Sequence, residues 1–182
     1  MPVWSRIAAV ITALLSVGCS TKPPPDVTVV SDFQLPRYLG NWYEIARLNH
    51  PFEQGLDHVT AHYSMREDGG VKVVNRGFNT EKNQWKESIG KAYFVQSPNI
   101  ASLKVSFFGP FYGGYNVIEL DSEYRYALIC GPNKDYLWIL ARTPTLDDNV
   151  KQKLLATAQR YGFKTQDLIW ANQSPIDMSP PH

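Results

Sequence analysis

The fold of this chain is decided by Tyr38-Leu-Gly-Asn-Trp-Tyr-Glu-Ile-Ala-Arg47. Gly40 lets the backbone enter a strand at an angle that other residues resist. Trp42 is the largest side chain available to fill one end of a closed sheet. Gly-x-Trp alone is a weak signal, because an edge turn before an ordinary core tryptophan gives the same pattern. The pattern that follows it predicts the first strand of a barrel.

Segments of alternating apolar and polar residues follow this stretch, at the spacing of an all-β barrel or sandwich. Asp68-Gly-Gly70 is a hairpin signal, Pro98 and Pro132 lie in predicted turns, and the glycine- and aromatic-rich stretch 109–114 is expected to be a longer loop. The eight predicted strands span 42–49, 58–66, 70–78, 85–96, 102–108, 115–121, 124–131 and 135–142.

After the eighth segment the hydrophobic period changes and predicts one helix. Thr145 is expected to cap it, with Asp148 three residues on as in a capping box, and Gly162 is expected to end it. A lone amphipathic helix must bury its stripe, and the outside of the barrel is the surface available. A short last strand is predicted at 168–170. The stripe consists of Leu146, Val150, Leu154, Ala158 and Tyr161.

The beginning of the chain predicts export. Arg6 precedes an apolar run at 7–17, which suits a secretory signal and is too short to span a membrane. The run ends in Leu15-Ser-Val-Gly-Cys19, which resembles a bacterial lipoprotein box whose cysteine carries lipid and begins the mature chain. The alternative is an ordinary signal peptide with a chance cysteine. Ser20, in place of Asp after that cysteine, implies the outer membrane by the same resemblance.

These features divide the chain into a signal peptide at 1–18, a lipid-anchored linker at 19–32, the barrel with its helix at 33–172, and a flexible tail at 173–182. The proline-rich start of the linker has the composition of a tether. Loss of Arg6 with the signal leaves 17 basic against 17 acidic residues, so the mature domain is formally neutral. This balance argues against a nucleic-acid partner, which would call for a basic stripe.

Cysteine usage points to a domain without disulfides. The chain has two cysteines, and if Cys19 carries lipid then Cys130 has no partner. An exported domain of this kind depends on its hydrophobic core for stability.

Three separated motifs resemble the signature regions of the lipocalins: Gly40-Asn-Trp42, Asp121-x-x-Tyr124-x-Tyr126 and Arg142. With Cys19 and the run at 105–115, the resemblance narrows to the bacterial outer-membrane lipocalins, relatives of apolipoprotein D. It covers about residues 33 to 170. It implies an eight-stranded antiparallel up-and-down β-barrel with one helix outside. The second motif departs from the Thr-Asp-Tyr of many animal members, so its contacts are not carried over.

Up-and-down connectivity places the start of the first strand and the end of the eighth at the same end of the barrel. Trp42 and Arg142 are therefore expected to meet, with the guanidinium stacked on the indole. Together with Gly40 they are predicted to close that end. The loops at about 48–57, 79–85, 109–114 and 131–135 fall at the opposite, open end. The interior of such a barrel can hold one small ligand.

Period-two alternation predicts which side chains face inward. Leu103, for example, shares one strand face with Val105 and Phe107, while Lys104 lies on the other face. The resemblance to apolipoprotein D supports positions 63, 75, 107 and 138 as pocket positions. The predicted ligand-binding residues are Tyr63, Asn75, Phe94, Val105, Phe107, Asn116, Ile118 and Trp138. Val73, Ala92 and Leu140 are also expected to face inward.

This mainly apolar set with a few polar groups suits a long apolar chain with a polar head. We therefore expect a membrane-anchored carrier or store for fatty acids or lysophospholipids, without catalytic residues, metal or cofactor. The loop at 108–115 is expected to be a lid, a membrane-touching lip or a self-packed hairpin, and its exposed aromatic residues also suggest a homodimer contact.

Enzyme chemistry has little support in the sequence. His58 and His62 would lie about 13 Å apart on one strand, too far to share a zinc ion. The acidic residues Glu44, Glu53, Asp57 and Glu119 show no convincing pairing, and no Gly-x-Ser-x-Gly motif occurs. Three alternatives stay open: a binder of haem or a bilin through Tyr63, a lipid-modifying enzyme using Cys130, and a scaffold whose barrel is filled.

Overall fold

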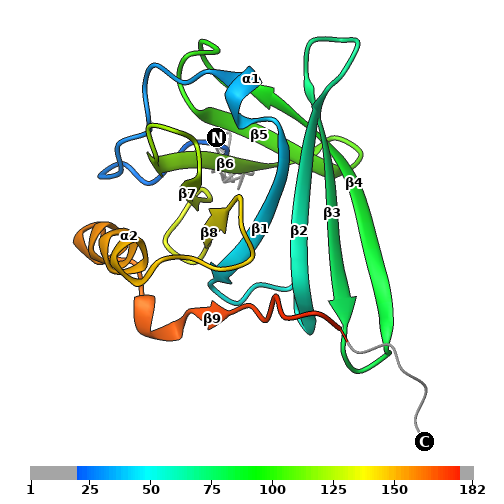
Figure 1. Ribbon diagram of the computed structural model, residues 1–182. Helices are drawn as coiled ribbons and strands as arrows, with labels where there is room; N and C mark the ends of the chain where they lie inside the picture. The colour runs from blue at the N-terminus through cyan, green and yellow to red at the C-terminus, as the bar shows by residue number, and fades with distance from the viewer. Residues whose placement is uncertain (1–19, 177–182) are drawn as a thin grey trace, which may run out of the picture.

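Eight antiparallel strands wind up and down into a closed barrel in the computed structural model, which describes residues 20–176 (Figure 1). Each strand pairs with the next, and β1 closes the barrel by pairing with both β2 and β8. The predicted all-β barrel is confirmed. The strands are β1 (Gly40–Arg47), β2 (Leu56–Met65), β3 (Val71–Asn79), β4 (Gln84–Phe94), β5 (Ser102–Phe108), β6 (Phe111–Leu120), β7 (Tyr126–Cys130) and β8 (Leu137–Ala141).

The connection between β5 and β6 is shorter than predicted. Instead of a long loop at 109–114, β6 already begins at Phe111, and Gly109 turns the chain with a φ of +50°. Phe108 pairs directly with Phe111 across this hairpin, after a register shift that follows Val105. The glycines at 113 and 114 belong to the strand and not to a loop.

One amphipathic helix, α2 (Asp148–Arg160), packs against the outside of the barrel as predicted (Figure 1). Its start was wrongly predicted. The cap is Asp147, whose carboxylate accepts a hydrogen bond of 2.9 Å from the Asn149 backbone N–H, because aspartate caps a helix as well as threonine does. Gly162, with a φ of +77°, ends the helix as expected. Three short elements complete the chain: α1 (Leu35–Tyr38), η1 (Thr165–Asp167) and β9 (Ile169–Trp170).

Alternation along β7 separates two apolar cores. Leu128 and Cys130 face outward and pack with Leu154 of α2. Ala127 and Ile129 face inward and join the core of the closed end, which also contains Trp42 and Tyr63. The outer core fixes the helix, and the inner core fills one half of the barrel.

The segment predicted as a lipid-anchored linker lies along the barrel from residue 20 onward. Val27 is buried, the Val30 N–H donates to the Val117 carbonyl, and the Val30 carbonyl accepts from the Ala101 N–H. Asp26 forms an ion pair of 2.7 Å with Lys134. The predicted signal peptide and Cys19 lie outside the described residues.

The closed end is organised by Arg142. Its guanidinium carbon lies 3.9 Å from the centre of the Trp42 ring, the contact that the strand order predicts. It also donates hydrogen bonds of 2.8–3.1 Å to the backbone carbonyls of Arg37, Leu39, Asn41 and Tyr124. These carbonyls belong to α1, the start of β1 and the β6–β7 turn, so one side chain joins three parts of the chain. Gly40 enters β1 with a φ of +95°, as its predicted role requires.

Replacing Arg142 by Lys keeps the charge but removes the planar fork that serves these carbonyls. We expect the free energy of unfolding in urea to fall by about 2–4 kcal/mol, from lost charged hydrogen bonds and a weaker contact with Trp42. Arg66→Lys is the control, because Arg66 pairs with Asp68 where both side chains are exposed and such pairs contribute about 0–1 kcal/mol. Equal unfolding midpoints for the two variants would contradict the role given to Arg142.

Candidate functional site

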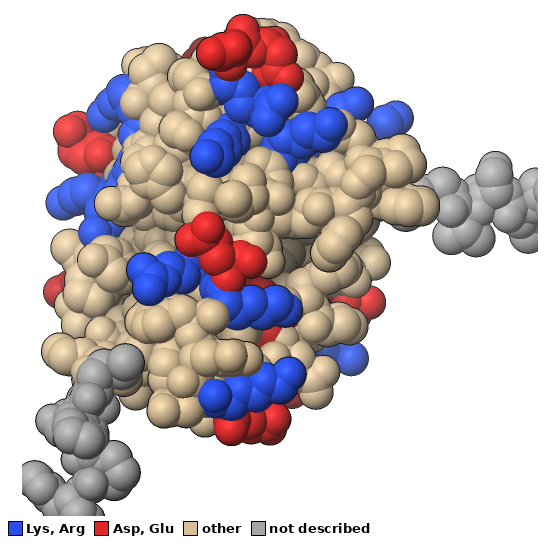
Figure 2. Space-filling model, turned by 90° about the vertical axis from the view of Figure 1, so that its right-hand side faces the viewer, with Lys and Arg blue, Asp and Glu red and all other residues tan. Residues whose placement is uncertain are grey.

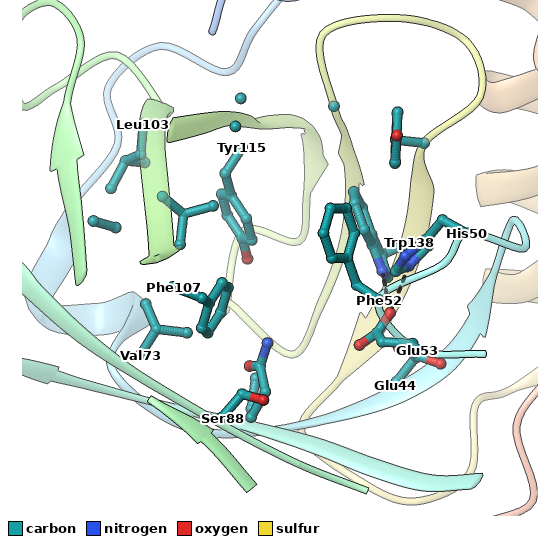
Figure 3. Close-up of a pocket in the computed structure, with 18 of the residues that line it drawn as sticks. Glu44, His50, Phe52, Glu53, Val73, Ser88, Leu103, Phe107, Tyr115 and Trp138 are labelled. Carbon is teal, nitrogen blue, oxygen red and sulfur yellow. Dashed lines mark hydrogen bonds and ion pairs between the residues drawn. The ribbon is translucent and has the colours of Figure 1, made fainter. Parts of the chain in front are cut away.

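The open half of the barrel encloses a cavity of about 1010 Å³. This is at the upper end of the roughly 300–1,000 Å³ typical of small-molecule sites. Figure 3 shows its two sides: an apolar wall that includes Val73, Leu103 and Phe107, and a side that carries Trp138 together with charged groups. The strand faces that alternate inward supply the apolar wall.

Five of the eight predicted ligand-binding residues line this cavity: Tyr63, Asn75, Val105, Phe107 and Trp138. Val73, Ala92, Leu103 and Leu140 line it as well. Phe94 does not line the cavity. Its ring packs edge-on against Phe33, with centroids 6.1 Å apart, in the core of the closed end.

Asn116 and Ile118 were wrongly predicted to face inward. On β6 the inward side chains are Tyr115 and Val117. Asn116 is fully buried and accepts a hydrogen bond of 2.6 Å from the Ser102 hydroxyl, while Ile118 packs in the outer core beneath α2. Both faces of this part of β6 are buried, because one meets the interior and the other meets the outer core, so alternation could not choose between them.

Three tyrosine hydroxyls form the polar floor of the cavity. Tyr115 OH lies 2.7 Å from Tyr38 OH and 3.0 Å from Tyr63 OH, and all three residues line the cavity. Burial raises the pKa of each of these hydroxyls above its ordinary value. They therefore stay neutral and offer hydrogen bonds at the inner end of an apolar space.

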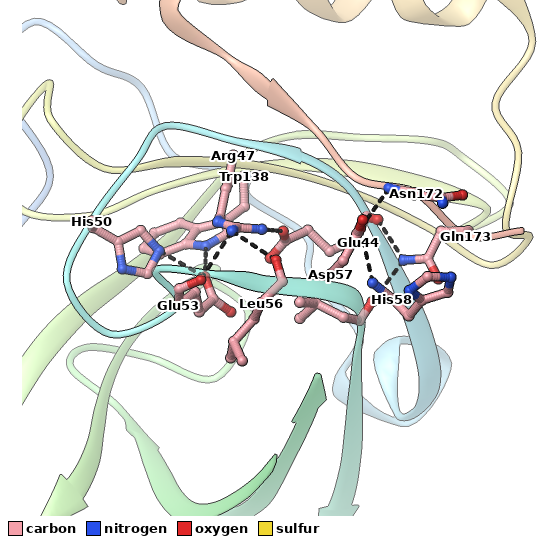
Figure 4. Close-up of polar contacts among 11 residues, drawn as sticks. Glu44, Arg47, His50, Glu53, Leu56, Asp57, His58, Trp138, Asn172 and Gln173 are labelled. Carbon is pink, nitrogen blue, oxygen red and sulfur yellow. Dashed lines mark hydrogen bonds and ion pairs between the residues drawn. The ribbon is translucent and has the colours of Figure 1, made fainter. Parts of the chain in front are cut away.

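The charged side of the cavity holds two acidic side chains, Glu44 of β1 and Glu53 of the β1–β2 loop. Glu44 Oε1 accepts a hydrogen bond of 2.5 Å from Arg47 Nη1. Glu53 Oε2 accepts one of 3.0 Å from Trp138 Nε1 and lies 2.7 Å from His50 Nε2. The last contact is an ion-pair distance and not a well-directed hydrogen bond. Figure 4 shows these side chains converging below Arg47.

Glu44 and Glu53 were predicted to show no convincing pairing. This is wrong, because Arg47 contacts both residues. Arg47 donates through Nη2 to the carbonyls of Glu53 and Leu56, which holds the β1–β2 loop over the cavity. Two residues of this cluster, Arg47 and His50, were missed. One signal was available: Glu44 lies two positions after Trp42 and so shares its inward face.

Burial is the main cause that raises the pKa of Glu44, from its ordinary 4.5 to about 8, and repulsion from Glu53 adds to it. Burial also disfavours charge on Glu53. The contacts with His50 and Trp138 outweigh it, and they hold the pKa of Glu53 below its ordinary value. Glu44 therefore holds its proton more readily than Glu53 does.

Residues 33–173 match the lipocalin-like domain family. The chain belongs to this lipocalin family. It is 60% identical to the outer membrane lipoprotein Blc of Citrobacter freundii over 174 residues, covering 95% of this chain and 98% of that protein. It is 32% identical to apolipoprotein D of Rattus norvegicus over 130 residues, covering 67% of each. Insecticyanin of Manduca sexta has a similar fold, with a TM-score of 0.67 at 21% identity over 83% of this chain and 87% of that chain.

These comparisons confirm the resemblance to the bacterial outer-membrane lipocalins, and with it the predicted location in the bacterial outer membrane. With the lipocalin barrel and its apolar cavity, they identify a protein that binds hydrophobic ligands. Lipid attachment at Cys19 stays a prediction.

The C-terminal segment lies against the backbone of β1 beside Glu44 (Figure 4). Here β1 and β2 separate, and β9 pairs with Ala46 and Arg47 in place of β2. Gln173 Nε2 then bridges the gap by donating to the carbonyls of Glu44 and Val59, at 2.8 and 2.9 Å. The predicted loose tail is therefore wrong for Gln173, and also for Ser174, whose carbonyl contacts His58 Nε2.

Exposed aromatic rings surround the mouth of the cavity. Phe52, Phe108 and Phe111 are 69%, 74% and 69% exposed, although all three also line the cavity. They come from the β1–β2 loop and the β5–β6 hairpin. Figure 2, turned to the right-hand side of Figure 1, shows the surface hollowed between charged side chains of both signs.

Other chemistries have little support within residues 20–176. No group of three or more potential metal-binding side chains is found in that part of the chain. Cys130 lies in the outer core and not in the cavity, and burial raises its pKa to about 12, which suppresses the reactive thiolate. The helices of the same residues include none that is long and apolar enough to cross a membrane.

The raised pKa of Glu44 predicts how stability depends on pH. Between pH 4.5 and about 8 the folded chain keeps a proton on Glu44 that the unfolded chain has lost, so the free energy of unfolding falls as the pH rises. The opposite effect of Glu53 is confined to pH values below its ordinary 4.5. Urea denaturation across this range should show a shallower fall for Glu44→Gln. Parallel profiles for the variant and the unsubstituted chain would contradict the assignment.

Proposed function

We propose that this lipocalin is a membrane-anchored, non-catalytic carrier or store for single-chain lipids, either fatty acids or lysophospholipids. The observation that supports this most strongly is the cavity of about 1010 Å³, whose lining is mainly apolar, with tyrosine hydroxyls at its floor and a charged cluster on one side. An acyl chain would lie along the wall of Val73, Leu103, Val105 and Phe107. Burial of its methylene groups supplies the binding energy, at about 0.8 kcal/mol for each CH₂.

The lipid anchor fits this function if Cys19 carries it. Ser20, the next residue, lines the cavity, so acyl chains on Cys19 would attach beside the cavity and hold it close to the bilayer. More than one acyl chain gives stable anchoring, whereas a single chain gives reversible binding. The exposed rings of Phe52, Phe108 and Phe111 suit the polar boundary of a membrane. Lipids released there would have a short path into the barrel.

The alternatives have weaker support. A scaffold with a filled barrel does not agree with the cavity volume. Haem ligation by Tyr63 needs a phenolate, and burial raises the pKa of that hydroxyl, which opposes its ionisation. An enzyme acting through Cys130 would need that thiol in the cavity. A homodimer through the aromatic rim stays a prediction.

Filling the cavity tests the function. The Cys19→Ala chain should leave the membrane fraction because it has lost its anchor, and it can then be purified without detergent. Lysophospholipid or fatty acid at micromolar levels should quench its tryptophan fluorescence, and Trp138→Phe should remove most of that signal. Val105→Trp should raise the Kd at least about tenfold, because the indole occupies the volume of the acyl chain.

Lys104→Trp is the matched control, since its side chain lies on the outer face and contacts Tyr112. It should bind lipid as the parent chain does. Absence of quenching in the parent chain, or equal Kd values for Val105→Trp and Lys104→Trp, would overturn the proposed function. Membrane retention of the Cys19→Ala chain would count against lipidation at Cys19.

A further inference from the structure

The charged side of the cavity has more acid than base available to a ligand. Glu44 and Glu53 both line it, and the Glu44 side chain is only 2% exposed. Arg47 is committed to the protein: its Nη atoms donate to Glu44 and to the carbonyls of Glu53 and Leu56. A ligand therefore meets carboxyl oxygens here and not a free guanidinium. An anionic group would be repelled, whereas a cation would relieve the repulsion between the two acids.

His50 adds an independent sign of a missing partner. The residue is 6% exposed and lines the cavity, yet among residues 20–176 its Nδ1 has no hydrogen-bond partner. With its proton on Nε2, facing Glu53 at 2.7 Å, Nδ1 is an acceptor directed at no donor. Buried polar atoms are normally satisfied, so this atom points to a ligand that donates an N–H or O–H group.

Aromatic rings enclose the same place. His50 lies edge-on to Trp138, with centroids 5.2 Å apart, and within 6 Å of Phe52 and Tyr136. Ring faces attract ammonium groups, most strongly when water is excluded. Figure 3 shows Glu44, His50, Phe52, Glu53 and Trp138 gathered on one side of the cavity, opposite the apolar wall.

We infer that Glu44, Glu53 and His50 form a subsite for the primary ammonium group of a lipid head, so that the preferred ligand is a single-chain lipid ending in an ethanolamine. This inference rests on the proposed function. The ammonium offers three donors, and the subsite offers acceptors on the two carboxyl groups and on His50 Nδ1. Lys86, exposed on β4, lines the same cavity and can face the phosphate. A zwitterionic head therefore suits this side of the cavity, because its ammonium meets the acidic subsite and its phosphate meets a basic side chain.

The test compares two ligands with the same acyl chain: lysophosphatidylethanolamine and its N-acetyl derivative, which has lost the positive charge. Calorimetric titration uses the Cys19→Ala chain at neutral pH. We expect the ammonium lipid to bind at least about tenfold more tightly, the size of one favourable charged contact. Because this comparison needs no change at the subsite, it does not depend on whether a variant folds.

Three variants locate the effect. Glu44→Gln and Glu53→Gln keep the shape and an acceptor oxygen but remove a carboxyl group whose ionised form a bound ammonium favours, and each should bring the ratio of the two Kd values close to one. The Kd of the N-acetyl lipid, whose head has no ammonium group to meet these carboxyl groups, is measured on each variant as the reference for this ratio. Glu119→Gln is the control, because Glu119 pairs with Lys153 of α2 on the outside of the barrel, at 3.0 Å, and it should keep the full ratio.

Equal Kd values for the two lipids on the parent chain would overturn the inference, as would a ratio that survives both substitutions. Its failure is distinct from failure of the proposed function. If fatty acid and N-acetyl lipid bind without any preference for the ammonium lipid, only the head-group subsite is wrong. If none of these lipids binds, the carrier function is wrong as well.

Discussion

The stacked pair of Arg142 and Trp42 is the contact on which the rest of the barrel depends. An up-and-down barrel must join its first strand to its last, and the ends of β1 and β8 meet where this guanidinium lies on the indole. Hydrogen bonds from the same side chain to four backbone carbonyls draw in α1 and the β6–β7 turn. With one end closed in this way, the inner core is confined to that half.

The open end can then carry groups that a core would not tolerate. β1 links the two ends of the barrel. It carries Trp42 at the closed end, and it then runs past Glu44 to Arg47 at the open end. Burying two acids, an arginine and a histidine costs free energy, and such clusters stabilise folds poorly compared with apolar packing. The cluster is therefore better understood through binding than through stability. Gln173 supports it from behind, where it joins β1 to β2.

The sequence predicted the architecture well because the barrel depends on local periodicity. Alternation located eight strands, the change of period located α2, and Gly40, Trp42 and Arg142 indicated the closed end. Alternation failed on β6 because both faces of that strand are buried. It therefore assigned Asn116 and Ile118 to the wrong side. It also missed the cluster around Glu53, since Arg47, His50 and Trp138 meet only after the barrel has closed. The place of Gln173 between two strands likewise depends on long-range contacts.

The central claim is that the barrel holds one single-chain lipid, and native mass spectrometry of protein extracted from its own membrane tests it most directly. The account predicts one bound lipid of the single-acyl class for each chain, released on collisional activation. A chain that carries no ligand, or that carries haem or another pigment in place of lipid, would contradict it.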